Sequence, residues 1–236
     1  MATNTQATVH DIKALSGDVW QVRLKPIEPY LYAAGQYTEL VIDGFEFLFF
    51  TIASAPHSPC IELHIQCGSD TNNRLIKHLQ QTDAVALAPA AGRCVLRSLP
   101  ESEKPLLLIA SGTGFSQVKA IVEDLLHQHS QRPTYIYWTS YKLSQLYMLE
   151  KAELWAEQNA HIHTAMLISE QGHWQDKNQM LVHSILADHE DIAQCHAVTC
   201  GSPEMVYTVL DTLCEHGFQS QHMISDVFEI APRDSQ

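Results

Sequence analysis

Basic residues are scarce in this sequence of 236 residues: 14 Lys and Arg stand against 27 Asp and Glu, which gives a formal net charge of −13. A negative field of this kind repels phosphate backbones and anionic lipid headgroups, so nucleic acid and membrane surfaces are poor partners. Apolar residues nowhere run for the roughly 20 positions that span a bilayer. The first residues, MATNTQATVHDIK, also lack the basic start and apolar core of a signal peptide. The sequence therefore predicts a soluble, cytoplasmic protein.

Cysteines are few and scattered, at positions 60, 67, 94, 195, 200 and 214, in a chain large enough to fold without disulfides, so we expect thiols. The C-x4-C-x2-C spacing of a plant-type iron–sulfur site is absent. His161 and His163 share one face of a predicted strand, but no third ligand follows at a familiar spacing, and no metal site is expected. The chain also lacks a Gly-x-Ser-x-Gly elbow and the order of a Ser-His-Asp triad, which argues against a hydrolase.

The sequence up to about residue 98 has the short periodicity of β-structure. In CIELHIQCG, apolar and polar residues alternate over 61–66, the period of two expected of a strand with one buried face and one free face. DVWQVRLKP and GQYTELVID are further strand candidates bounded by Gly, Pro or Asp. Several such strands at short spacing predict an antiparallel Greek-key β-barrel, interrupted by one short helix over 71–80.

After the polar segment SLPESEKP, strands and helices alternate. PLLLIAS is a continuous apolar run, and SQVKAIVEDLLHQH has apolar residues at helical spacing. Further strand candidates are TYIYWTS, HIHTAMLIS and HAVTCGS, and further helix candidates are LSQLYMLEKAELWAEQ, KNQMLVHSILADH and PEMVYTVLDTLCEHG. This alternation predicts an α/β domain with a doubly wound parallel sheet. The domain boundary is expected at residues 99 to 104, which divides the chain into 1–100 and 101–236.

Two turns in the second half have the pattern of a ligand site. IASGTGFSQ places Gly112 and Gly114 between a strand and a helix, where unpaired amides and the helix dipole stabilise an anion such as a pyrophosphate. The third glycine of the dinucleotide fingerprint is missing, and Gln117 stands there. CGSPEM opens a later helix, with Ser202 at its N-cap and Pro203 at its first position. Ligands bind outside the carboxyl ends of such strands, so the two turns would flank one crevice; the alternatives are a plain tight turn and an ordinary helix cap.

Taken in order, the segments AAGQY, FFTIAS, LHI, LLLIASGTGFS, YIYW and CGSPEM resemble the ferredoxin-NADP reductase superfamily. They look most like its small NAD(P)H:flavin reductases without an iron–sulfur domain, the type that accompanies bacterial luciferase. The resemblance runs from about Ala7 to Ile230. It implies a barrel that binds flavin, and an α/β domain that binds NADH or NADPH. It also implies that the flavin, whether FMN, riboflavin or FAD, is a substrate or a loosely bound cofactor.

The resemblance assigns roles to single residues. FFTIAS matches the family's flavin-binding strand, so Phe50 takes the aromatic place and Thr51 that of the serine whose hydroxyl reaches flavin N5. LHI matches the strand at the edge of the flavin ring, and SDVFEI matches a C-terminal segment that stacks at the flavin. The residues implied in flavin contact are Phe50, Thr51, His64, Ile65 and Phe228. Those implied in dinucleotide contact are Gly112, Thr113, Gly114, Ser116, Cys200, Gly201 and Pro203.

Two positions depart from the family pattern. The arginine of the flavin-binding strand falls on Leu48 and its proline on Phe49. Losing a hydrogen bond to a charged group costs roughly 1.5 to 3 kcal/mol, so flavin is expected to bind weakly, as a diffusible second substrate. The other interpretation is that FEFLFF is covered on both faces, fills the space, and has lost flavin. The family's Gly-Gly-Arg is replaced by Thr139 to Lys142. Lys142 is then either a ligand of the dinucleotide or an ordinary solvated lysine. The preference for NADH or NADPH stays open.

These residues predict direct hydride transfer from C4 of a reduced nicotinamide to N5 of a flavin stacked between the domains. Thr51 would donate a hydrogen bond to N5 and Cys200 would pack against the nicotinamide, which makes them the expected catalytic residues. The protein would orient the rings and exclude water. A flavin-dependent oxygenase would accept the reduced flavin. Two alternatives stay open: a reductase component that holds flavin firmly and serves a partner oxygenase, and a non-catalytic interaction protein that retains the reductase fold.

Overall fold

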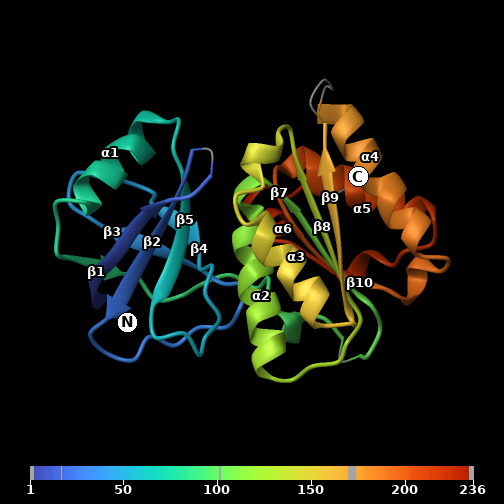
Figure 1. Ribbon diagram of the computed structural model, residues 1–236, viewed down its shortest axis with the longest axis horizontal. Helices are drawn as coiled ribbons and strands as arrows, with labels where there is room; N and C mark the ends of the chain where they lie inside the picture. Colours follow the sequence, from blue (N-terminus) through green and yellow to red (C-terminus); the bar gives the residue numbers. More distant parts are fainter. Residues whose placement is uncertain (1–2, 17, 101, 170–173, 234–236) are drawn as a thin grey trace.

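The computed structural model describes residues 3–16, 18–100, 102–169 and 174–233, with two β-sheets side by side (Figure 1). The chain completes the first sheet before it enters the second, and helix α2 (Phe115–His127) lies between the two (Figure 1). The expected domain border at residues 100 and 101 falls in the connection between the last strand of the first sheet and the first strand of the second.

The first sheet is antiparallel and six-stranded. It consists of β1 (Thr5–Ala14), β2 (Val19–Pro26), β3 (Tyr37–Val41), β4 (Phe49–Thr51), β5 (Ile61–Gln66) and β6 (Ala84–Leu87), in the spatial order β4-β3-β6-β1-β2-β5. A bridge between Ile52 and Leu63 joins its two edges and closes it into a barrel. Helix α1 (Asp70–Leu79) starts at Ser69, whose hydroxyl accepts a hydrogen bond from the Asn72 amide, and adds its apolar face to the barrel core.

The second sheet is parallel and five-stranded. It consists of β7 (Leu106–Ser111), β8 (Thr134–Ser140), β9 (Ile162–Ile168), β10 (His196–Cys200) and β11 (Met223–Ile224), in the order β11-β10-β7-β8-β9. Alternate residues of β7 point to opposite faces: Leu106 and Leu108 pack with α2 and α3 (Leu149–Gln158). Leu107 and Ile109 pack with α4 (Trp174–Asp188) and α5 (Pro203–Glu215). Short α6 (Val227–Ile230) follows β11. Helices on both faces keep the sheet buried, as parallel strands require.

The predicted fold is confirmed, with two local differences. The helix expected over LSQLYMLEKAELWAEQ is a 3-10 turn at Leu143–Gln145 followed by α3, because the chain breaks where Leu146 and Tyr147 turn inward and become buried. Only the last two residues of the apolar run FEFLFF, Phe49 and Phe50, belong to a strand, β4. Phe47 has φ of +57°, a left-handed conformation that a strand does not tolerate, so the regular strand starts after it.

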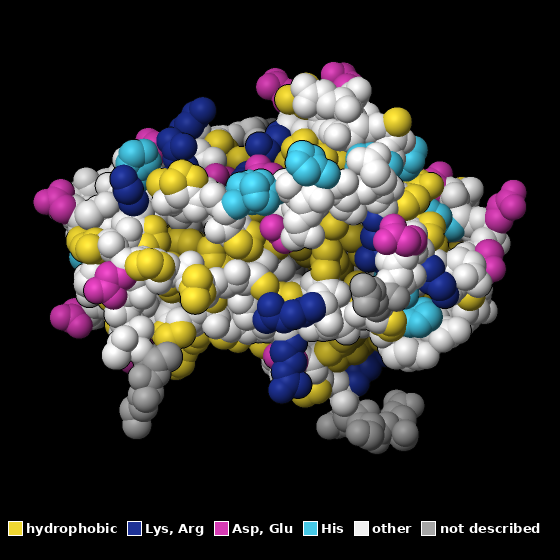
Figure 2. Space-filling view, turned by 90° about the horizontal axis from the view of Figure 1, so that it is seen from below, with side chains coloured by type: hydrophobic (Ala, Val, Ile, Leu, Met, Phe, Trp, Pro, Cys, Tyr) yellow, Lys and Arg dark blue, Asp and Glu magenta, His cyan; other side chains and the backbone are white. Residues whose placement is uncertain are grey.

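The surface agrees with the negative net charge. The face seen in Figure 2 carries acidic side chains around its rim and Lys and Arg side chains in small separate groups, with hydrophobic side chains between them. No basic patch that would suit nucleic acid extends across this face. Within the described ranges, no helix combines the length and the apolar character needed to cross a membrane. All six cysteines are free thiols.

Candidate active site

Two cavities open at the carboxyl edge of the parallel sheet, beside the barrel. The larger, of about 440 Å³, is lined by Thr51 and Gln66 of the barrel and by the ends of β7 and β10. The smaller, of about 280 Å³, lies at the ends of β7 and β8. Both cavities are lined by Gln66, Ser111, Gly112 and Thr113. They therefore form one continuous depression with the Gly-Thr-Gly turn at its middle.

The Gly-Thr-Gly turn is fixed by the strands on either side of it. Gly112 has φ of +54°, which glycine adopts without a steric penalty, and its carbonyl accepts a hydrogen bond of 3.0 Å from Trp138 Nε1. Trp138 in turn stacks on Phe115, the first residue of α2, with ring centroids 3.8 Å apart. Gly114 lies so close to β10 that a Cβ there would be 2.9 Å from the carbonyl carbon of Cys200. The turn thus holds the amino end of α2 beside the end of β10.

Gln117, which stands where the dinucleotide fingerprint has its third glycine, joins three parts of the chain. Its side chain is buried. Nε2 donates to the carbonyl of Gly35 in the barrel at 2.6 Å and to Asp226 Oδ2 in the C-terminal segment at 3.0 Å. Oε1 accepts a hydrogen bond from Cys200 Sγ. A glycine at this position would remove these hydrogen bonds. Gln117 therefore links the two domains and orients the Cys200 thiol.

Strand β4 presents Thr51 to the larger cavity. Side chains alternate along it and the residue before it: Leu48 and Phe50 pack with the barrel core, whereas Phe49 and Thr51 occupy the outer face. In the part of the chain that the structure describes, no hydrogen bond engages the Thr51 hydroxyl. Phe49 is 51% exposed and meets Tyr37 edge-on, with centroids 6.0 Å apart. The alternative interpretation, a strand covered on both faces, is therefore wrong. Leu48 belongs to the barrel core and does not face the cavity.

The polar face of β5 is not free, contrary to the expectation from its alternation. His64 and Glu62 are buried against α2 and the segment before α3. His64 Nε2 lies 2.8 Å from Glu62 Oε1, so it is the donor of that pair. His64 Nδ1 lies 3.0 Å from both Tyr147 Oη and Ser116 Oγ, and its single lone pair accepts a hydrogen bond from one of these hydroxyls. Alternation reveals which residues are polar but not what packs on them, and here the polar face forms the junction between the domains.

Charged groups extend this junction. Lys119 of α2 is buried, with Nζ 3.2 Å from Glu62 Oε1 and 2.9 Å from Glu123 Oε2, and it donates to the carbonyl of Ala53 at 3.1 Å. Burial opposes ionisation of Glu62, but the hydrogen bond from His64 and the charge of Lys119 outweigh it and hold the Glu62 pKa at about 2. Burial lowers the pKa of His64 despite the neighbouring carboxylate. The junction thus contains an ionised Glu62 and a neutral His64.

Half of the residues expected at the site line the larger cavity. These are Thr51, Gly112, Thr113, Gly114, Cys200 and Gly201. The others lie elsewhere: Phe50 and Ile65 pack in the barrel, His64 and Ser116 form the domain junction, and Pro203 starts α5. Phe228 packs against Tyr207 of α5, with centroids 5.7 Å apart, and its neighbour Val227 faces the cavity instead. The roles of the six lining residues stay predictions.

Several residues of the depression carry no signal in the sequence. Thr199 Oγ1 and Asp226 Oδ1 are buried without a hydrogen-bond partner among the described residues, and both residues line the larger cavity. Burial raises the pKa of Asp226. Lys177 lines the smaller cavity, and its Nζ donates to Ser111 Oγ at 3.0 Å across 66 residues of sequence. The segment SDVFEI draws attention to this end of the chain, but nothing in it singles out Asp226 over Phe228.

Comparisons with known proteins identify the family of the chain. Residues 108–211 match the family described as the oxidoreductase NAD-binding domain. An NAD(P)H-flavin reductase of Vibrio harveyi is 30% identical over 236 residues, which cover 94% of this chain and 98% of that protein. The chain belongs to the NAD(P)H-flavin reductase family. A second NAD(P)H-flavin reductase, of Aliivibrio fischeri, is 30% identical over 207 residues, covering 84% of this chain and 86% of that one.

Solved structures of reductases share the two-domain fold of this chain. A cytochrome P450 reductase of Amycolatopsis has a TM-score of 0.82 at 22% identity, over 95% of this chain and 69% of that one. A ferredoxin NADP+ reductase of Neisseria gonorrhoeae, with bound FAD and NADP, has a TM-score of 0.76 at 16% identity, over 95% and 98% of the two chains. The prediction of a small NAD(P)H:flavin reductase is confirmed at the level of the family.

Proposed function

We propose that the chain catalyses hydride transfer from NADH or NADPH to a weakly bound, diffusible flavin in the depression between the barrel and the parallel sheet. The observation that carries this proposal is the pair of cavities that share the Gly-Thr-Gly turn. A dinucleotide has two halves joined by a pyrophosphate, and the depression has two lobes joined at an anion-binding turn. Membership of the NAD(P)H-flavin reductase family supports the same assignment.

The larger cavity fits the nicotinamide half. Cys200 and Gly201 form one wall, and the Cys200 thiol is held by Gln117. The partnerless oxygens of Thr199 and Asp226 suit a carboxamide, whose amide group donates and whose carbonyl accepts. A buried polar atom without a partner costs about 1–3 kcal/mol, so a ligand that supplies these hydrogen bonds gains affinity and a fixed orientation. We assign Thr199 and Asp226 to the recognition of the carboxamide.

The barrel side of the same cavity fits a flavin ring. The nicotinamide supplies a hydride and the flavin accepts it at N5, so the protein acts by binding, orienting and shielding the two rings. Thr51 offers an unengaged hydroxyl at the cavity wall. Phe49 and Tyr37 lie on the same face of β3 and β4 and provide an apolar shelf beside it. None of Leu48, Phe49 and Phe228 lines either cavity, so these side chains leave the gap between the domains open.

Weak flavin binding follows from the composition of this wall. Thr51, Gln66, Tyr37 and Phe49 carry no charge, and the aligned position of the family's arginine is buried in the barrel core as Leu48. Ring contacts and single neutral hydrogen bonds hold the flavin without an ion pair to its phosphate. We therefore propose that flavin leaves after reduction and passes to a flavin-dependent oxygenase. Six free cysteines suit a reducing compartment, and we propose a cytoplasmic location.

The direct test of this function is to mix the purified protein with NADH or NADPH and with riboflavin, FMN or FAD, and to follow the nicotinamide absorbance. We expect oxidation of the nicotinamide only when a flavin is added, by a protein that is purified colourless. A yellow protein with poor activity on free flavin would favour the electron-transfer component instead. A protein that binds neither ligand would favour the non-catalytic alternative.

Replacement of Thr51 by Ala is expected to lower kcat about 10- to 100-fold, with little change in the KM for NADH. A hydrogen bond to a group on which charge develops is worth about 1.5–3 kcal/mol, and only the hydroxyl is lost. Thr51→Ser is the matched variant, because it retains the hydroxyl and should keep most of the rate. Stopped-flow reduction of saturating flavin measures the step. An unchanged rate in the Ala variant would remove Thr51 from the catalytic residues.

A further inference from the structure

Lys177 of α4 is a cation in an unusual position. Only 7% of its surface is exposed, and it lines the smaller cavity. Its Nζ donates to Ser111 Oγ at 3.0 Å and lies 4.4 Å from the ring centroid of Tyr141. Ser111 is the last residue of β7 and Tyr141 follows the end of β8, so the ammonium lies across the ends of two neighbouring strands.

Among the described residues, the partners of this ammonium are neutral. Across the described ranges, no carboxylate lies within ion-pair distance of Lys177, although lysine is almost never buried without a counter-charge. A hydroxyl oxygen and the face of an aromatic ring satisfy part of its hydrogen-bonding capacity and none of its charge. Burial lowers the pKa of Lys177 accordingly. An anion entering the smaller cavity would supply the missing charge.

The position of Lys177 also decides which anion it meets. Its partner Ser111 directly precedes Gly112, and Ser111, Gly112 and Thr113 are among the residues shared by the two cavities. An anion at the amides of the turn therefore lies next to the Lys177 ammonium. We propose that Lys177 binds the pyrophosphate of the nicotinamide dinucleotide, an inference that rests on the function proposed above. The cation comes from α4, on the opposite face of the sheet from the helix that follows the turn.

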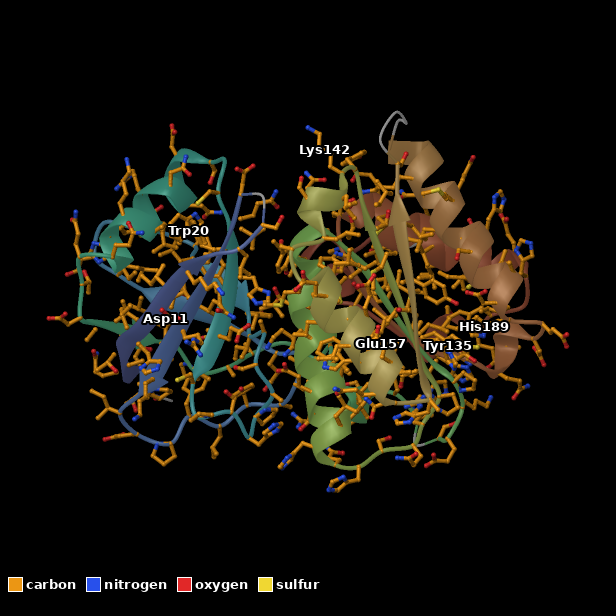
Figure 3. All side chains as sticks on the ribbon, viewed as in Figure 1. Asp11, Trp20, Tyr135, Lys142, Glu157 and His189 are labelled. Carbon is orange, nitrogen blue, oxygen red and sulfur yellow. The ribbon has the colours of Figure 1, made fainter. Side chains whose placement is uncertain are left out.

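This assignment separates Lys177 from Lys142, the cation that the sequence suggests. Lys142 also lines the smaller cavity, but it is exposed at the carboxyl edge of the sheet, whereas Lys177 is buried there (Figure 3). The pyrophosphate is common to NADH and NADPH, whereas the 2′-phosphate belongs to NADPH alone. Lys177 therefore contributes equally to the binding of both dinucleotides and does not discriminate between them.

The test compares wild type with Lys177→Gln, and with Lys25→Gln as a control that removes an equal charge from an exposed site on β2. For Lys177→Gln we expect the KM of NADH and of NADPH to rise by a similar factor, about 10-fold or more, with kcat unchanged. Calorimetry should show the same loss of affinity for ADP-ribose, which contains the pyrophosphate, and none for adenosine, which lacks it. Lys25→Gln should match wild type in each measurement. Lys177→Met keeps the apolar stem and serves if the Gln variant is unstable.

Three results would overturn the assignment. Unchanged KM values for both dinucleotides would remove Lys177 from the site, and a rise for NADPH alone would move it to the 2′-phosphate. An equal loss of adenosine affinity would make its effect structural. Failure of the proposed function is recognised separately, because wild type would then oxidise neither nucleotide in the presence of flavin. Calorimetry with ADP-ribose would still report on Lys177 in that case.

Discussion

Replacement of Glu62 by Ala is expected to lower the free energy of unfolding by about 3 kcal/mol, near the lower end for breaking a buried ion pair. The side chains of His64 and Lys119 are 0% and 4% exposed, so neither finds water in place of the lost carboxylate. Lys119 keeps its contact with Glu123, which limits the loss. For a chain of this length the melting temperature should fall by about 6–12 °C, measured by calorimetry or by circular dichroism.

The matched control is Asp11→Ala on the barrel (Figure 3). Asp11 Oδ2 pairs with Arg23 Nη2 at 2.7 Å, but the two side chains are 38% and 41% exposed. Exposed pairs are worth about 1 kcal/mol or less, so this variant should melt close to wild type. Equal losses in the two variants would show that burial at the domain junction adds nothing to the Glu62 contact, and would contradict the role given to it.

The same network predicts a loss of stability in acid. The neutral His64 has a folded pKa below its ordinary value, so the unfolded chain takes up the proton first and stability declines as the pH falls below about 6.5. Glu62, with a folded pKa of about 2, adds its contribution in full above about pH 4.5 and loses it as the pH falls from there towards 2. Urea titrations at several pH values should show the difference between wild type and Glu62→Gln shrinking below pH 4.5. A constant difference would mean that Glu62 is not ionised in the folded protein.

The fold could be predicted from local sequence patterns, because most helices and strands have a recognisable hydrophobic periodicity. The continuous apolar run at 106–111 and the helical spacing that follows it give β7 and α2. Ser202 and Pro203 mark the start of α5, where the Ser202 hydroxyl accepts a hydrogen bond from the Met205 amide at 3.3 Å. The break before α3 was missed, because burial of Leu146 and Tyr147 is a tertiary effect that helical spacing does not reveal.

The site was predictable where it depends on turns and much less so where it depends on packing. The Gly-Thr-Gly and Cys-Gly turns line the cavity as expected, because backbone geometry fixes them locally. His64 lies on the predicted strand, but it is buried and not free, since the residues that bury it come from α2 and from the segment before α3. The direction of the side chain at Leu48 depends on the left-handed Phe47, which an alignment of residue types does not show. Lys177 reaches the turn from a distant helix, and only the tertiary structure reveals that proximity.

Replacement of Gly114 by Ala is expected to lower kcat/KM for both dinucleotides about 100-fold, largely through weaker dinucleotide binding, and to destabilise the protein by about 1–3 kcal/mol. The added Cβ would lie well inside van der Waals distance of the Cys200 carbonyl oxygen, 2.9 Å from its carbon and 3.1 Å from its Cβ. These are atoms of β10 and of a side chain held by Gln117, so they yield only if the turn moves. A displacement of about 1 Å between the turn and β10 separates the two walls of the cavity, and errors of that size cost about 100-fold in catalysis.

Gly201→Ala separates this effect from a general intolerance of side chains in the cavity. Its Cβ would meet Met205 at Cε, 2.6 Å away, and at Sδ, 3.0 Å away, which form the mobile end of a flexible side chain. Met205 can change rotamer where the Cys200 carbonyl cannot, so Gly201→Ala should retain dinucleotide affinity within about threefold. Calorimetric titration with NADP+ measures both variants independently of turnover. Wild-type affinity in Gly114→Ala, or equal losses in the two variants, would show that the close approach of the turn to β10 is not what shapes the site.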